Sequence, residues 1–164
     1  MQPMMMKLGM SKEETMEYLA SGRDGVLGCN GADGYPYCVP VNYILSDGKI
    51  YFHGRPAGDK YDNIKRDPKV CLTVYAHEAF EITGPETCNV TTLYTSVIVR
   101  GTCQEVTDQA EKERILHEMV RILVPVKDKG PVNPSRAAAA AVFCITIESA
   151  TGKRRPAMPG HQTV

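Results

Sequence analysis

Hydrophobic and polar residues alternate in several short segments of the chain, and this alternation predicts a protein built mainly from strands. Within Lys49–His53, Ile50 and Phe52 alternate with Tyr51 and His53, which is the two-residue period of a strand. Five other segments show the same alternation, β-branched residues or a run of small residues, and are also predicted as strands: Gly25–Cys29, Tyr35–Ile44, Lys69–Tyr75, Thr95–Val106 and Val142–Glu148. Six strands, joined mostly by short turns, favour a small antiparallel β-barrel with peripheral helices.

Helix signals occur around these predicted strands. Ser11 and Glu14 form the S-x-x-E pattern of a capping box, and Gly22 can end the helix that follows. Apolar residues recur at helical spacing after Thr107, which we expect to cap a second helix. Pro134 stands where a further helix would begin.

The length and order of these elements favour one domain. At 164 residues the chain can form a hydrophobic core of its own. We expect residues 1–155 to form this single domain and residues 156–164, which include Pro and Gly, to be a mobile tail or a lid. Residues 76–94 lack a clear period, so we expect a long connection there that is either functional or poorly ordered.

The most informative polar residues lie where a predicted strand passes through a Gly/Pro-rich loop into a short helix. This helix is predicted to begin at Asp59, its N-cap, and to end before a proline. His53, Arg55 and Lys60 are three potential cations around the helix start, where positive charge is disfavoured. A bound anion, phosphate above all, would explain them, and Asn63 would share a helix face with Lys60. The alternative is a solvated basic loop.

Composition excludes several classes of protein. The chain is 43% hydrophobic and 23% charged, which is ordinary for a globular protein in water, and its formal net charge is zero. Nothing therefore favours a nucleic acid or a membrane surface as a partner. The Met-rich start of the chain lacks the apolar region and cleavage site of a signal peptide, so we expect a cytoplasmic protein.

The six cysteines are scattered and form no C-x-x-C pair. We therefore expect mostly buried free thiols and no metal site or disulfide framework.

Several segments, in this order and spacing, resemble the FMN-binding split barrels of the pyridoxamine 5′-phosphate oxidase-like family, and most of all its nitroimidazole-resistance branch. The matching pieces lie between Gly25 and Lys153 and read G-V-L-G, D-G-Y-P-Y, V-P-V-N-Y, D-G-K-I-Y-F-H-G, G-x-K-x-D-N-I-x-x-x-P-x-V, T-T-x-Y-x-S-V-I-V-x-G and I-x-I-E-x-x-T-G-K. Arg55, Pro56 and Arg100 depart from what is common in the family and can alter the substrate pocket.

The resemblance implies a homodimer of six-stranded antiparallel split β-barrels with FMN at the subunit interface. Lys60 would bind the FMN phosphate, with Asn63 on the same helix face, and this agrees with the interpretation of the helix start given above. The other positions that the resemblance implies lie beside the flavin: Pro40, Val41, Asn42 and Tyr43, partly through backbone groups, His53 and Gly54 at the end of the neighbouring strand, Ser96 and Val97 near the ring, and Thr151, Gly152 and Lys153 from across the interface.

The activity that the resemblance implies is that of an FMN-dependent oxidoreductase, either a nitroreductase or an enzyme like pyridoxamine-phosphate oxidase. NAD(P)H would be the electron donor, and the acceptor would be a small flat molecule such as a nitroimidazole or another nitroaromatic. His53 would deliver a proton near neutral pH or contact the phosphate; its alternative is packing at a strand end. Two other hypotheses stay open: a non-catalytic carrier or sensor of flavin or of haem, with His53 or His77 as haem ligand, and a structural dimerisation module.

Overall fold

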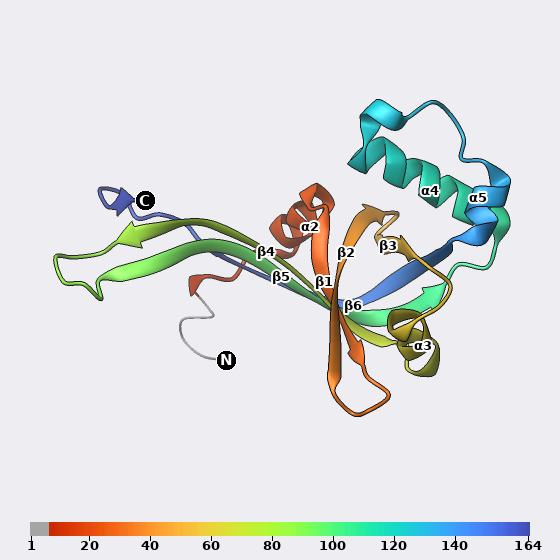
Figure 1. Cartoon of the computed structure of the whole chain (residues 1–164). Coiled ribbons are helices and arrows are strands. Elements are labelled where there is room, and N and C mark those ends of the chain that lie inside the picture. Colours follow the sequence, from red (N-terminus) through yellow and green to blue (C-terminus); the bar gives the residue numbers. More distant parts are fainter. Residues whose placement is uncertain (1–6) are drawn as a thin grey trace.

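The centre of the molecule is a closed antiparallel barrel, seen here in a computed structural model that describes residues 7–164 (Figure 1). Its six strands are β1 (Asp24–Asn30), β2 (Pro36–Ser46), β3 (Lys49–Gly54), β4 (Lys69–Ile82), β5 (Val90–Glu105) and β6 (Ala141–Arg155). They follow the order β1-β2-β3-β6-β5-β4, and β4 pairs back with β1. The prediction of a mainly β, six-stranded antiparallel split barrel is confirmed.

The barrel is split because β2 changes partners along its length. Pro36–Asn42 pairs with β1, whereas Tyr43–Ser46 pairs with β3. Among residues 7–164, the first half of β2 has no strand partner on its β3 side. The backbone N–H and C=O groups on that edge are therefore available to a ligand, as they are on any strand at the edge of a sheet.

Helical segments that lie wholly within residues 8–164 surround the barrel: α2 (Lys12–Ser21), α3 (Asp59–Arg66), α4 (Gln109–Leu123), the 3₁₀ turn η1 (Pro125–Lys127) and α5 (Pro134–Ala139). The predicted capping box of α2 is confirmed, because Ser11 and Glu14 each accept a hydrogen bond from the other's backbone N–H. Two predicted caps were wrong. Gly58, at φ 94°, occupies the N-cap of α3, so Asp59 is the first helical residue. Asp108, not Thr107, caps α4.

Two hydrophobic clusters hold the barrel and its helices together. Inside the barrel, the rings of Phe52 and Phe143 stack with centroids 5.0 Å apart, and both side chains are fully buried. The second cluster lies on the outer face of β2, β3 and β6, where α4 covers it with Ile115 and Met119. The residues of β3 therefore face two different cores in alternation.

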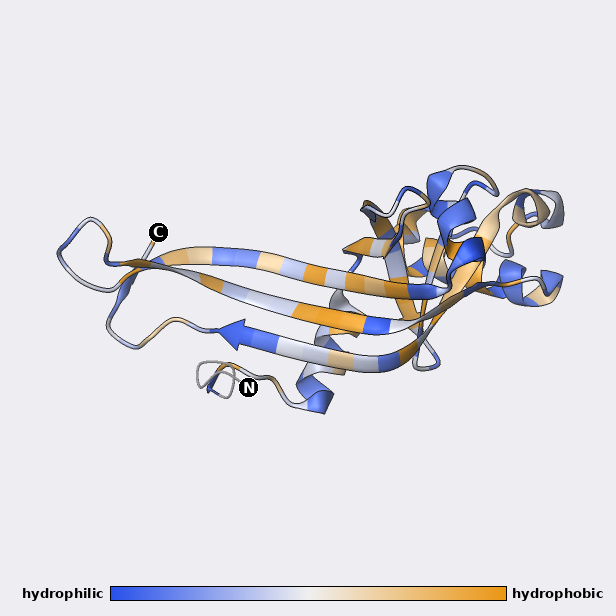
Figure 2. Ribbon diagram, turned by 90° about the horizontal axis from the view of Figure 1, so that it is seen from below, coloured by the Kyte–Doolittle hydropathy of each residue, from blue (hydrophilic) through white to orange (hydrophobic). Residues whose placement is uncertain are grey.

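Three strands continue beyond the barrel as an arm, which we define as residues 76–98 and 150–155 (Figures 1 and 2). The expectation of an irregular connection over 76–94 was wrong, because most of this segment is the hairpin of β4 and β5, with a register shift between His77 and Ala79. Over residues 76–92 the arm packs on no large core, so the side chains there carry no clear hydrophobic period, whereas Leu93, Thr95 and Val97 are buried in alternation and Val97 joins the barrel core.

The C-terminal segment pairs with the arm. Strand β7 (Gln162–Thr163) lies antiparallel to β4, and the backbones of Phe80 and Val164 exchange two hydrogen bonds of 2.9 Å. Composition alone did not indicate this pairing for the predicted tail. Beneath it, Glu81 is completely buried and one of its carboxylate oxygens accepts a hydrogen bond from the Met158 N–H.

Candidate functional site

Lys60 places a partly buried positive charge at the end of the barrel. Its Nζ lies 5.5 Å from the centre of the Phe52 ring. Gly54 makes room for this ammonium, because a Cβ there would lie 2.8 Å from Nζ. No carboxylate of residues 7–164 forms an ion pair with Lys60, and burial lowers the pKa of its ammonium. A desolvated cation without a counter-ion favours the binding of an anion at this place.

His53 lies next to this charge, one residue before Gly54 on β3. It pairs with Val142 of β6, and its side chain is exposed at the rim of a groove under α4. Crowding by surrounding atoms lowers the pKa of His53, and the charge of Lys60 lowers it further. The imidazole is therefore neutral at pH 7, in a form that can accept or donate one proton.

The four predicted residues of β2 divide between the two faces of the strand. Pro40 and Asn42 are exposed, whereas the side chains of Val41 and Tyr43 are buried in the barrel. The Tyr43 hydroxyl donates a hydrogen bond of 2.9 Å to the backbone carbonyl of Leu19. Val41 and Tyr43 can therefore meet a ligand at the split only through their backbone groups.

The predicted residues of β5 and β6 lie side by side. Ser96 is the cross-strand partner of Lys153, and Val97 is that of Gly152. Val97 is buried, while Ser96 and Lys153 share the outer face of the sheet, because cross-strand partners point to the same side. Gly152 allows α2 to approach, since a Cβ there would lie 2.6 Å from the Thr15 hydroxyl oxygen.

Asn63 and Lys60 turn to different neighbours although they are close on α3. Asn63 is buried, and its side-chain oxygen accepts a hydrogen bond of 3.0 Å from Arg66. It lines a cavity of about 330 Å³ that α3 forms with the β1–β2 hairpin, while Lys60 lies against β3. The structure thus brings His53, Gly54 and Lys60 together at the barrel end, whereas Asn63 contacts Arg66 and the cavity beside the β1–β2 hairpin.

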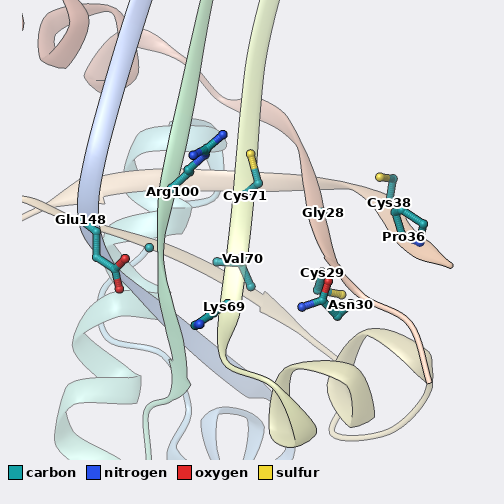
Figure 3. Close-up of a pocket in the computed structure, with 11 residues that line it drawn as sticks. Gly28, Cys29, Asn30, Pro36, Cys38, Lys69, Val70, Cys71, Arg100 and Glu148 are labelled. Atoms are coloured by element: carbon teal, nitrogen blue, oxygen red, sulfur yellow. The ribbon is translucent and has the colours of Figure 1, made fainter. Parts of the chain in front are cut away.

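A trough of about 430 Å³ lies over the outer face of β1, β4 and β5 (Figure 3). Gly28 lies between the side chains of Cys38 and Cys71, and leaves the floor open. Arg100 and Glu148 border the trough. Of the residues that line the trough, only Arg100 was predicted from the sequence to alter a pocket, because the trough depends on strand register and on the missing side chain of Gly28.

The cysteines of the chain are all unpaired. Cys29 and Cys103 are buried, and burial raises the pKa of the Cys103 thiol to about 12. Cys38 and Cys88 are exposed, so the expectation of buried thiols was wrong for these two. Within residues 7–164, no three His, Cys, Asp or Glu side chains are grouped so as to hold a metal ion. None of the helices described in this range has the length and apolarity needed to span a bilayer.

Comparisons with known proteins agree with this architecture. Residues 11–154 match the family model described as pyridoxamine 5′-phosphate oxidase. Among solved structures, the chain is similar to an FAD-binding protein from Mesorhizobium loti, with 27% identity, a TM-score of 0.67 and coverage of 90% of this chain and 97% of the other. It is also similar to the flavocytochrome Anf3 from Azotobacter vinelandii, with 25% identity, a TM-score of 0.80 and coverage of 92% and 71%.

A third similar structure is that of a candidate 5-nitroimidazole antibiotic resistance protein from Bacteroides thetaiotaomicron VPI-5482. It has 22% identity and a TM-score of 0.75, with coverage of 89% of this chain and 86% of the other. At this level of identity the similarity establishes a shared fold.

Proposed function

We propose a flavin-dependent oxidoreductase function for this chain, which belongs to the pyridoxamine 5′-phosphate oxidase family. Two of the similar structures, at 25% and 27% identity, are described as a flavocytochrome and as an FAD-binding protein. We propose FMN as the flavin, NAD(P)H as the electron donor and a small flat nitroaromatic, such as a nitroimidazole, as the acceptor. The nitroimidazole-type acceptor is supported by the sequence motifs quoted above.

The observation that carries this proposal is the unpaired ammonium of Lys60. Among residues 7–164 it has no carboxylate partner, and Gly54 leaves space beside it. A phosphate group would supply the missing negative charge through a charge-assisted hydrogen bond. The exposed Arg55 stands in the same loop and can add a second contact.

The remaining residues fit a flavin that extends from this phosphate along the split. The unpaired edge of β2, from Pro40 to Asn42, can offer backbone groups to the ring. A bound flavin supplies the redox chemistry, and the protein supplies position and charge. The neutral imidazole of His53 can hold a proton at the Lys60 end of this site, because desolvation by the surrounding atoms and the charge of Lys60 lower its pKa.

We also propose a homodimer in which the outer face of the sheet meets a second copy of the chain. Val26 and Ile98 are each 44% exposed there, and Tyr75 is 58% exposed. The three lie on adjoining strands, because Thr73 pairs with both Val26 and Ile98. Ser96 and Lys153 share this face, so a partner seated on it would complete a site that one chain leaves open.

The first experiment is to purify the protein, add FMN and measure flavin absorbance after gel filtration. Lys60→Met should weaken FMN binding by about 1–3 kcal/mol, the range of a charge-assisted contact. Lys65→Met is the matched control, because Lys65 lies on the same helix but is paired with Glu105 at 2.7 Å. A colourless protein that does not take up added FMN would contradict the proposal.

A non-catalytic carrier or sensor of flavin or haem is the second candidate, and the flavocytochrome at 25% identity favours it. It predicts a bound cofactor with no turnover of NAD(P)H and nitroaromatic acceptors. The absorption spectrum distinguishes flavin from haem, and His53→Ala and His77→Ala test the two proposed haem ligands.

A further inference from the structure

The second hydrophobic cluster is incomplete at one end. There, a groove of about 270 Å³ opens between α4, α5 and the end of β3. Its walls are apolar and include Leu116, Met119, Val120 and Val132. Met119 is buried in the cluster itself, whereas Leu116 and Val120 are half-buried, so the groove continues the core out to the surface.

Two basic side chains, and no acidic one, line this groove. They are His53 at the end of β3 and Arg136 on α5. Within residues 7–164, neither side chain has a hydrogen-bond or ion-pair partner. Because the imidazole of His53 is neutral at pH 7, Arg136 supplies the positive charge of the groove. An apolar body with one uncompensated cation complements a ligand with an apolar body and one negative group.

We propose that this groove binds a small apolar carboxylate, with the hydrophobic part between α4 and α5 and the carboxylate on Arg136. The size of the groove limits the ligand. An apolar cavity of about 150 Å³ holds a benzene ring, so 270 Å³ has room for a ring, a short linker and a carboxylate. Pockets for drug-sized ligands are larger, about 300–1,000 Å³.

The site is separate from the flavin groove proposed above, although His53 borders both. The ligand is held by α4, α5 and the loop before α5, whereas the phosphate of the proposed flavin lies at Lys60 on α3. The inference does not depend on flavin binding, and the experiment below can succeed or fail whether or not FMN binds.

The test is a titration of the full-length chain, with FMN added, followed by amide chemical shifts in NMR. The probe is 3-phenylpropionate, and 3-phenylpropan-1-ol is its uncharged counterpart. We expect saturable shifts at Val120 and Val132, and binding of the carboxylate about fivefold tighter than that of the alcohol. Equal affinity for the two probes, or no saturation by the carboxylate, would overturn the proposal.

Variants locate the binding site. Arg136→Gln should remove the preference for the carboxylate and leave the affinity for the alcohol unchanged, whereas Arg121→Gln, on an exposed arginine of α4 outside the groove, should keep it. Val120→Phe should fill the groove and abolish binding of both probes. If α4 does not tolerate the larger ring of Val120→Phe, Val132→Phe is used in its place, because it fills the groove from the opposite wall. Carboxylate binding that survives in a folded filling variant would place the ligand elsewhere and refute the assignment.

Discussion

The barrel and the arm are built from the same strands, yet they are held together differently. In the barrel, each strand places alternate side chains in an interior where Phe52, Phe143 and Leu72 are fully buried. In the outer part of the arm, residues 76–92, the same β4 and β5 continue with no such interior, and Glu81 is the one buried side chain there; only where the arm joins the barrel do Leu93, Thr95 and Val97 become buried in alternation. Burial of apolar surface therefore stabilises the barrel, whereas the arm depends on strand pairing.

This difference shows why one end of the molecule is suited to a ligand site. The barrel interior fixes the end of β3, and with it the positions of His53 and Gly54. A rigid core can hold a partly buried cation such as Lys60 beside them, at the cost of its desolvation. Four predictions test how far the contrast between the barrel and the arm extends.

The largest expected effect is the loss of an aromatic ring from the barrel. Phe143→Ala should lower the free energy of unfolding by about 3–5 kcal/mol, because it leaves a cavity beside Phe52. Phe80→Ala is the same change in the arm, where the ring is 44% exposed, and should cost less than about 1 kcal/mol. Urea unfolding measures both. Similar costs for the two variants would mean that the arm has a core of its own.

The next effect compares two glycines. A Cβ on Gly101 in the barrel would lie 2.2 Å from the backbone oxygen of Thr146, which cannot move away without disturbing β6. Gly101→Ala should therefore cost about 1–3 kcal/mol. In the arm, the atoms nearest to a Cβ on Gly84 belong to the side chain of Asn89, which can move aside at the loss of the hydrogen bond that it accepts from the Glu86 N–H, so Gly84→Ala should cost less, about 0.5–1 kcal/mol. Thermal and urea unfolding report both values.

Removal of residues 156–164 should act on the arm alone. The Phe80 amide loses its bond to the Val164 carbonyl, and Glu81 loses the cover of Met158, so amide hydrogen exchange should become faster over Phe80–Ile82. Amides of Val70–Thr73, which pair with β1 in the barrel, should keep their protection. Faster exchange in both regions would show that barrel and arm unfold as one unit.

The smallest effect concerns the barrel end. Lys60→Met should raise the pKa of His53 in an NMR titration, because the charge of Lys60 lowers it, while Lys65→Met should leave it unchanged. Burial keeps the folded-state pKa below that of the unfolded chain, near 6.5. As the pH falls below this value, His53 takes up a proton in the unfolded chain before it does so in the folded protein. The free energy of unfolding therefore decreases with falling pH, and this decrease stops once the pH is below the folded-state pKa. A His53 pKa that does not respond to Lys60→Met would remove the electrostatic link between the two residues.

The sequence predicted the barrel well because its alternation has a physical cause. Ile50 and Phe52 point into the interior, where only apolar side chains are stable, and the pattern follows. The strands over residues 76–94 were missed for the converse reason, since a segment without a core has no period to detect. The N-cap of α3 was predicted one residue too late, at Asp59, because Gly58, at φ 94°, takes that position with no side-chain hydrogen bond to reveal it.

The candidate site was predictable only in part. Lys60 was found because a cation beside a helix start is unusual, and its unpaired state in the structure agrees with that argument. The groove under α4 could not be found in this way. His53 and Val132 are far apart in the sequence, and each wall residue is an ordinary apolar position of a helix or loop. Its existence depends on how α4 and α5 pack against the barrel.

The pairing of β7 with β4 has a consequence for behaviour at high concentration. β4 pairs with β1 only over Val70–Thr73. Beyond these residues, the edge of β4 that faces away from β5 continues into the arm, where its backbone groups can pair with a strand of another chain. β7 covers the end of that edge, and the irregularity at His77 and the exposed carboxylate of Glu78 interrupt the remainder. The intact protein is thereby protected against edge-to-edge polymerisation, and a form clipped before residue 156 is the one from which fibrils would grow.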